Sequence, residues 1–119
     1  MENSNCFSIG NIDQFILQRS QLLRIPADTY KRILLASVDP SLKDLDQLRQ
    51  AIDQKDYSDI QTIAHRLKGV YANLRIEELS SPAKEINQMA LETGAIQGIS
   101  KRFEHLKTSL TILQDAVQP

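Results

Sequence analysis

The chain has 119 residues, 41% of them apolar, and a formal net charge of −1. This length suits one domain with a single core, and a near-neutral charge argues against a nucleic-acid-binding protein, which is normally basic. No run approaches the ~20 apolar residues needed to cross a bilayer, and no signal peptide is recognisable. The single cysteine, Cys6, cannot form an internal disulfide, so we expect a reducing, cytoplasmic setting and an incidental thiol.

The first part of the chain predicts a lead-in followed by a short helix. Residues 1–10 are mostly polar and indicate a flexible lead-in or linker remnant, with the folded domain over residues 11–119. Asn11 is a typical N-cap and predicts a helix over about residues 12–23, which Pro26 separates from the next element. Its expected core-facing residues are Ile12, Phe15, Ile16, Leu22 and Leu23.

A long second helix is predicted after Asp28, a candidate N-cap. Its apolar positions recur at spacings of three and four: Tyr30, Ile33, Leu34, Val38, Leu42, Leu45, Leu48 and Ile52. Pro40 lacks an N–H, and its ring collides with the carbonyl of Ala36, which predicts a kink near residues 37–40. Two helices with a tight joint are the alternative.

Two further helices follow. Asp56 can cap a third helix over residues 57–73, and a joint at residues 74–76 separates it from a fourth helix that begins near Glu77. Pro82 is expected in the first turn of that fourth helix, where backbone N–H groups have no intrahelical partner. The core-facing positions of the fourth helix are Leu79, Ala83, Ile86, Met89 and Ala90.

The last helix has the clearest periodicity in the chain. Gly94 and Gly98 are expected to bracket a loop, and the helix should start near Ser100. Its apolar residues recur at spacings of four and three: Ile99, Phe103, Leu106, Leu110, Leu113 and Val117. No stretch alternates like a strand. We therefore predict an all-α fold: an antiparallel up-down four-helix bundle with an additional short N-terminal helix and a second helix kinked near Pro40.

The third predicted helix carries an unusual polar face. Its apolar side comprises Ile60, Ile63, Ala64, Leu67, Tyr71 and Leu74. His65 lies almost opposite and should point outward, together with Gln61, Lys68, Gly69 and Ala72 at spacings of four, three, four and seven. A mid-helix glycine costs roughly 1 kcal/mol relative to alanine. We interpret this face as an exposed imidazole beside a cation, with room for another protein to approach.

The residues around His65 resemble a known family. The run is Ala64-His65-Arg66-Leu67-Lys68-Gly69, continued by Ala72-Asn73-Leu74 and Glu77-Glu78-Leu79. It is similar to the histidine-containing phosphotransfer (HPt) domain of bacterial multistep phosphorelays, and the order of helices agrees from about residue 11 onward. Arg75 and Ile76 depart from the pattern, which usually has glycine and often alanine at these positions.

The resemblance implies a function and a set of site residues. His65 would accept a phosphoryl group from an aspartate of one receiver domain and pass it to an aspartate of a response regulator. Lys68 would stabilise the phosphoryl oxygens, Gly69 would give steric clearance, and Gln61, Arg66 and Ala72 would contact the partner. The receiver would bring Mg²⁺, so no cofactor or metal is expected on this chain, nor any kinase activity of its own.

Other interpretations remain open. A helical adaptor with the same fold could dock a receiver without phosphotransfer. A metal-binding bundle is disfavoured because neither His65 nor His105 has a glutamate three residues before it, and we treat His105 as a surface residue. We expect a monomer without nucleic-acid or membrane contact, which either stands alone or forms the cytoplasmic C-terminal domain of a membrane-anchored hybrid sensor kinase.

Overall fold

Five α-helices account for most of residues 7–117, the part of the chain that the computed structural model describes. They are α1 (Ile12–Leu23), α2 (Ala27–Asp53), α3 (Tyr57–Asn73), α4 (Glu77–Glu92) and α5 (Ile96–Val117). Residues 7–117 contain no strand, which confirms the all-α class. None of these helices combines the length and apolarity required to cross a membrane.

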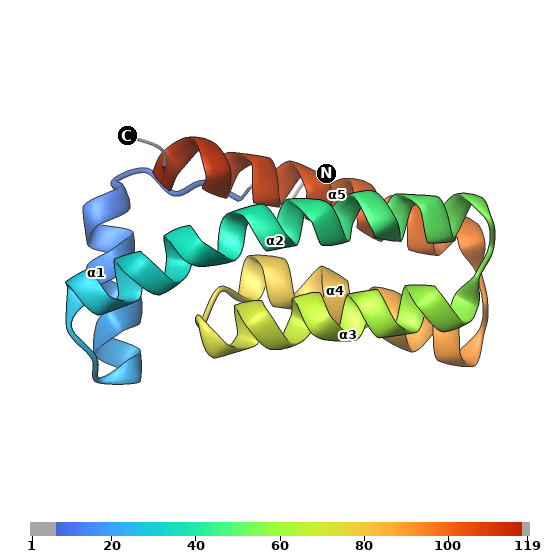
Figure 1. Ribbon diagram of the computed structural model, residues 1–119, viewed down its shortest axis with the longest axis horizontal. Coiled ribbons are helices and arrows are strands. Elements are labelled where there is room, and N and C mark those ends of the chain that lie inside the picture. Colours follow the sequence, from blue (N-terminus) through green and yellow to red (C-terminus); the bar gives the residue numbers. More distant parts are fainter. Residues whose placement is uncertain (1–6, 118–119) are drawn as a thin grey trace.

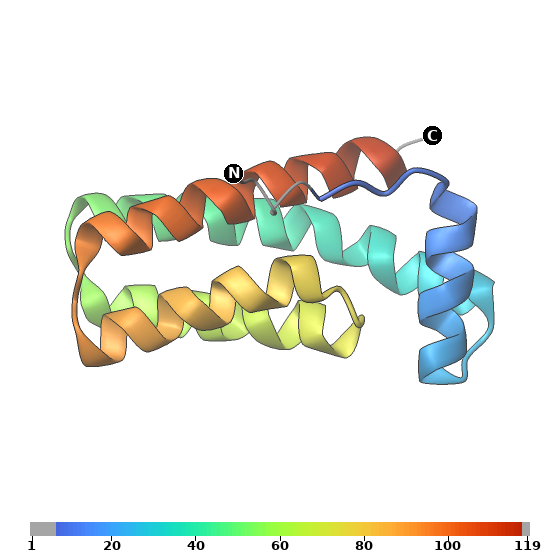
Figure 2. The same cartoon turned by 180° about the vertical axis from the view of Figure 1, so that it is seen from behind.

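The four longer helices lie along the long axis of the molecule. Figures 1 and 2 show α2, α3, α4 and α5 running back and forth, with successive connections at opposite ends. They form a closed ring of contacts, α2 with α3, α3 with α4, α4 with α5, and α5 with α2. The short α1 lies across one end and packs against α2 (Figure 1). The core therefore runs lengthwise between the four helices, and each keeps one face free for solvent or partners.

Two buried tyrosines tie α2 to α3 inside this core. The Tyr30 hydroxyl donates to the carbonyl oxygen of Leu74 at 2.6 Å, and the Tyr71 hydroxyl donates to Ser41 Oγ at 2.6 Å. Both tyrosines are fully buried, which confirms that Tyr71 belongs to the core. Because each hydroxyl has a partner, neither burial leaves an unsatisfied polar group, which would cost about 1–3 kcal/mol.

Two of the three predicted N-caps are confirmed. Asn11 Oδ1 accepts from the backbone N–H of Asp13 at 2.9 Å, and Asp56 Oδ1 accepts from that of Asp59 at 3.2 Å, so both predicted N-caps are confirmed. Asp28 is not a cap, because α2 already begins at Ala27. The Asp28 carboxylate instead lies in the first turn, where a negative charge is favourable.

The two helical prolines differ from expectation. Helix α2 is continuous through Pro40, so the alternative of two separate helices is wrong, whereas a bend at Pro40 stays a prediction. Pro82 lies five residues after Glu77, beyond the first turn of α4, so its expected placement is wrong too. Pro82 has no N–H, so it cannot donate a hydrogen bond to the Glu78 carbonyl. It is buried on the side of α4 that faces α5.

The last connection is shorter than predicted. Helix α5 begins at Ile96, so Gly98 lies within its first turn and does not bound a loop. Gly94 alone makes the turn, with a left-handed φ of 61°. A Cβ at Gly98 would overlap the Met89 methyl group of α4. The glycine therefore leaves room for the Met89 side chain of α4, a tertiary role that local sequence does not distinguish from a loop signal.

Two predictions of burial also need correction. Leu22 and Ile33 were expected to face the core but are 66% and 47% exposed. Because α1 lies across the end of the bundle, it has only one covered side. Phe7, within the predicted loose lead-in, is buried and packs near Phe15 with ring centroids 6.4 Å apart. Cys6 lies outside the described residues.

Candidate functional site

Helix α3 places His65 on the outside of the bundle. The helix begins after its Asp56 cap and buries one stripe, which comprises Ile60, Ile63, Ala64, Leu67 and Tyr71. His65 is exposed, as its position opposite that stripe predicts. The imidazole is thus held on a helix packed against both neighbours, α2 and α4, yet is open to a second protein.

Small or missing side chains one turn from His65 leave open space beside the imidazole. Gly69 has no heavy atom within 4 Å of the position that a Cβ would occupy, so its missing side chain opens space next to His65. Lys68 is half-buried and forms no ion pair with any other residue between positions 7 and 117. Ala72 is exposed, and Gln61 is half-buried. Residues three and four positions apart are neighbours on a helix surface, so these side chains surround the imidazole.

Arg66 is held by a residue that the sequence did not single out. Its Nε and Nη2 atoms donate to Asp44 Oδ2 and Oδ1 at 3.0 and 2.8 Å. Asp44 belongs to α2, and its side chain is 16% exposed compared with 48% for Arg66. The hydrogen bonds to Asp44 raise the pKa of Arg66. The guanidinium of the residue that follows His65 is therefore paired with the neighbouring helix α2.

Helix α4 contributes a second residue that sequence reasoning missed. Asn87 Nδ2 donates to the backbone carbonyl of Gln61 at 2.8 Å, one turn before His65. The Tyr57 hydroxyl at the start of α3 donates to the carbonyl of Gly94, just after the end of α4, at 2.9 Å. Together these bonds fix the register of α4 against α3. No local pattern marks Asn87, because its partner is 26 positions away in sequence.

The end of α3 explains one departure from the family pattern. Arg75 has a φ of 60°, in the left-handed region that favours glycine. Its N–H donates to the Ala72 carbonyl at 3.1 Å, and the N–H of Ile76 donates to that of Tyr71 at 2.8 Å, which is a Schellman C-cap. Arg75 therefore adopts the conformation that glycine adopts most readily, and the joint keeps its geometry without one.

Comparison with known protein families assigns the chain to a family. The family model for the Hpt domain matches residues 32–116. The chain belongs to the Hpt domain family. No curated protein and no solved structure matched it significantly. Hpt domains carry out histidine phosphotransfer in phosphorelays and interact with receiver domains, so this Hpt domain is a phosphorelay component.

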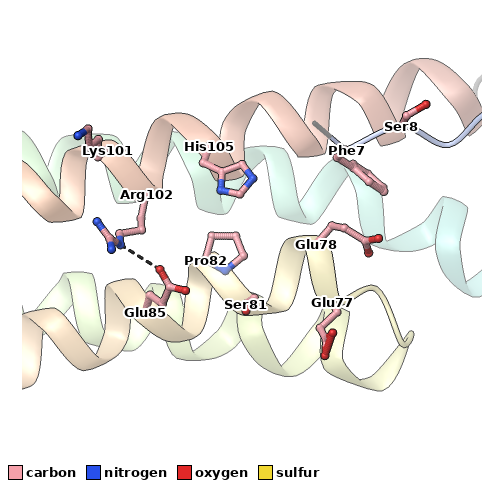
Figure 3. Close-up of a pocket in the computed structure, with 10 residues that line it drawn as sticks. All are labelled: Phe7, Ser8, Glu77, Glu78, Ser81, Pro82, Glu85, Lys101, Arg102 and His105. Carbon is pink, nitrogen blue, oxygen red and sulfur yellow. Dashed lines mark hydrogen bonds and ion pairs between the residues drawn. The ribbon is translucent and has the colours of Figure 1, made fainter. Parts of the chain in front are cut away.

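A separate groove of about 760 Å³ lies between α4, α5 and the segment around Phe7. Figure 3 shows His105 directed toward Pro82 within it, with Glu85 and Arg102 to one side. His105 was predicted to be a surface residue, and it is half-buried in this groove. The groove contains none of the six residues predicted for the site of the Hpt domain. Between residues 7 and 117, no group of three or more His, Cys, Asp or Glu side chains is arranged to hold a metal ion.

Proposed function

We propose that His65 is the phosphoacceptor of this Hpt domain, taking a phosphoryl group from one receiver aspartate and passing it to another on a response regulator. The observation that carries the proposal is the exposed imidazole beside Gly69, whose missing side chain leaves open space. A receiver must bring an aspartyl phosphate within bonding distance of the ring, and phosphoryl transfer depends mainly on such placement and on stabilising the charge of the moving group.

The transfer can be written with its bonds balanced. A ring nitrogen of the neutral imidazole attacks phosphorus, an N–P bond forms, and the P–O bond to the receiver carboxylate breaks with its electron pair. The other ring nitrogen keeps its proton, so the imidazolium charge offsets that of the phosphoryl group. Lys68 lies one turn along and supplies an ammonium to the phosphoryl oxygens. Transfer to the second receiver is the same step in reverse.

The surroundings of His65 support docking of a receiver over a shallow surface. Ala72 and Gly69 add little height, and Gln61 and Lys68 are half-buried beside the ring. We infer that receivers of a hybrid sensor kinase and of a response regulator bind here in turn to a monomer. In this proposal, α2 to α5 act as an antiparallel four-helix bundle with α2 bent at Pro40. Mg²⁺ would come with the receiver, and this chain would add Lys68.

Phosphorylation without a known receiver provides the first test. The chain is incubated with phosphoramidate, a small phosphoryl donor that modifies histidines, and then analysed by intact mass and acid lability. We expect one acid-labile phosphoryl group on the wild type and none on His65→Gln. The matched control is His105→Gln, which alters the other histidine of the chain and should label normally.

A phosphorylated receiver provides the second test. Label should pass to the wild type, and Lys68→Gln should slow transfer without preventing docking. Docking of the receiver with no label on His65 would instead support a helical adaptor. His65→Gln should keep its helical signal and melting temperature, because an exposed residue contributes little to stability.

A further inference from the structure

The ion pair between Arg66 and Asp44 involves the residue that directly follows the proposed phosphoacceptor in the sequence. Arg66 follows His65 in α3, and its side chain leaves the helix about 100° further around. A long arginine side chain at this position could turn toward a phosphoryl group on His65, and its fork of N–H donors matches phosphoryl oxygens in bidentate geometry. Two of those donors are instead engaged by Asp44 of α2, at 2.8 and 3.0 Å.

We infer that Asp44 withholds the Arg66 guanidinium from the phosphoryl group on His65, so that Lys68 alone of the α3 cations serves it. This inference rests on the proposed function of His65. It assigns Asp44 as a positioning residue that sets the charge of the site, although it lies 22 positions before Arg66 and on another helix.

Withholding the arginine has a consequence for a relay. A phosphorelay intermediate must release its phosphoryl group as readily as it accepts it, so a bidentate clamp on the phosphorylated state would stabilise the ground state and favour retention. Lys68 is a single flexible ammonium, which holds the oxygens less rigidly than a guanidinium fork does. The Arg66–Asp44 pair is also net neutral, which limits the charge that a docking receiver meets on the α2 side.

The test measures the pKa of the phosphoryl group, which depends on the charges around it. Wild type and variants are phosphorylated with phosphoramidate, and the pKa of the phosphoryl group is followed by phosphorus NMR. Asp44→Ala releases Arg66 and should lower this pKa by about 0.5, which is about a threefold change in acid dissociation, the size of a solvent-exposed charge pair. The double variant Asp44→Ala with Arg66→Gln should return the pKa to near the wild-type value.

Controls separate the arginine from a general charge effect. Glu85→Gln breaks the ion pair to Arg102, which joins α4 to α5 at 2.9 Å in the groove that contains His105 (Figure 3). This variant should leave the phosphoryl pKa unchanged. The inference is overturned if Asp44→Ala leaves the phosphoryl pKa at the wild-type value. It is also overturned if the double variant keeps the lowered value, since loss of the Asp44 charge alone would then account for it.

A second measurement checks the ion pair independently of phosphorylation. A double-mutant cycle of Asp44→Ala and Arg66→Gln in urea unfolding should show a coupling of about twofold to fivefold in the unfolding constant. No coupling would mean that Asp44 does not hold Arg66 in solution, and the inference would fail. Absence of a phosphoryl signal on the wild type, with the coupling intact, would instead count against the proposed function of His65.

Discussion

Replacing Gly69 by alanine should separate stability from function in this Hpt domain. Gly69 lies inside α3, has no positive φ, and leaves open space where a Cβ would stand. Alanine is favoured over glycine in a helix interior by about 1 kcal/mol. Since nothing crowds the new methyl group, the free energy of unfolding should rise by nearly this full amount. For a domain of this size, that corresponds to a melting temperature higher by about 4 °C.

The same substitution should impair transfer, more so with a larger side chain. Gly69→Ala adds a methyl group to the surface proposed to face the receiver, and Gly69→Leu would occupy the open space one turn from His65. The assays are thermal unfolding by circular dichroism and the rate of phosphotransfer from a phosphorylated receiver.

Gly98 offers the matched control for stability. It is also a helical glycine, but a Cβ there would overlap the Met89 methyl group. Gly98→Ala should therefore gain less stability than Gly69→Ala, because the Met89 side chain must move aside. If Gly69→Ala is no more stable than the wild type, the space at Gly69 is not open. If Gly69→Leu transfers phosphoryl groups at the wild-type rate, clearance is not the function of this glycine.

Three further predictions concern stability. Arg75→Gly should raise the free energy of unfolding by about 1 kcal/mol in urea titrations, because Arg75 holds a left-handed φ of 60°; an unchanged midpoint would contradict this. Asp56→Ala should lower it by about 1 kcal/mol through loss of the α3 N-cap, and Asp56→Asn should restore most of it. Burial raises the pKa of Tyr30 from 10.0 to about 12. The folded state therefore retains a proton that the unfolded state loses, so stability should fall between pH 10 and pH 12, and less steeply in Tyr30→Phe.

Local sequence was sufficient for most of the helices and for the outward direction of His65. Asn11 and Asp56 cap their helices because a side-chain oxygen near a free N–H needs no tertiary contact. The apolar stripe of α3 likewise places His65 on the opposite side by helix geometry alone. Leu22 and Ile33 were misassigned because an apolar side chain shows only that it can be buried, and not whether a neighbour covers it.

What the sequence determined by itself was the set of helices and the identity of the face that carries His65, Lys68 and Gly69. Both follow from periodicity and spacing within single helices. Only the tertiary structure decided that Asp44 holds Arg66 and that Asn87 holds the carbonyl of Gln61. These contacts join residues more than twenty positions apart, and their existence depends on how α2 and α4 pack against α3. Side-chain pairing across helices is set by that packing register, which no pattern within one helix records.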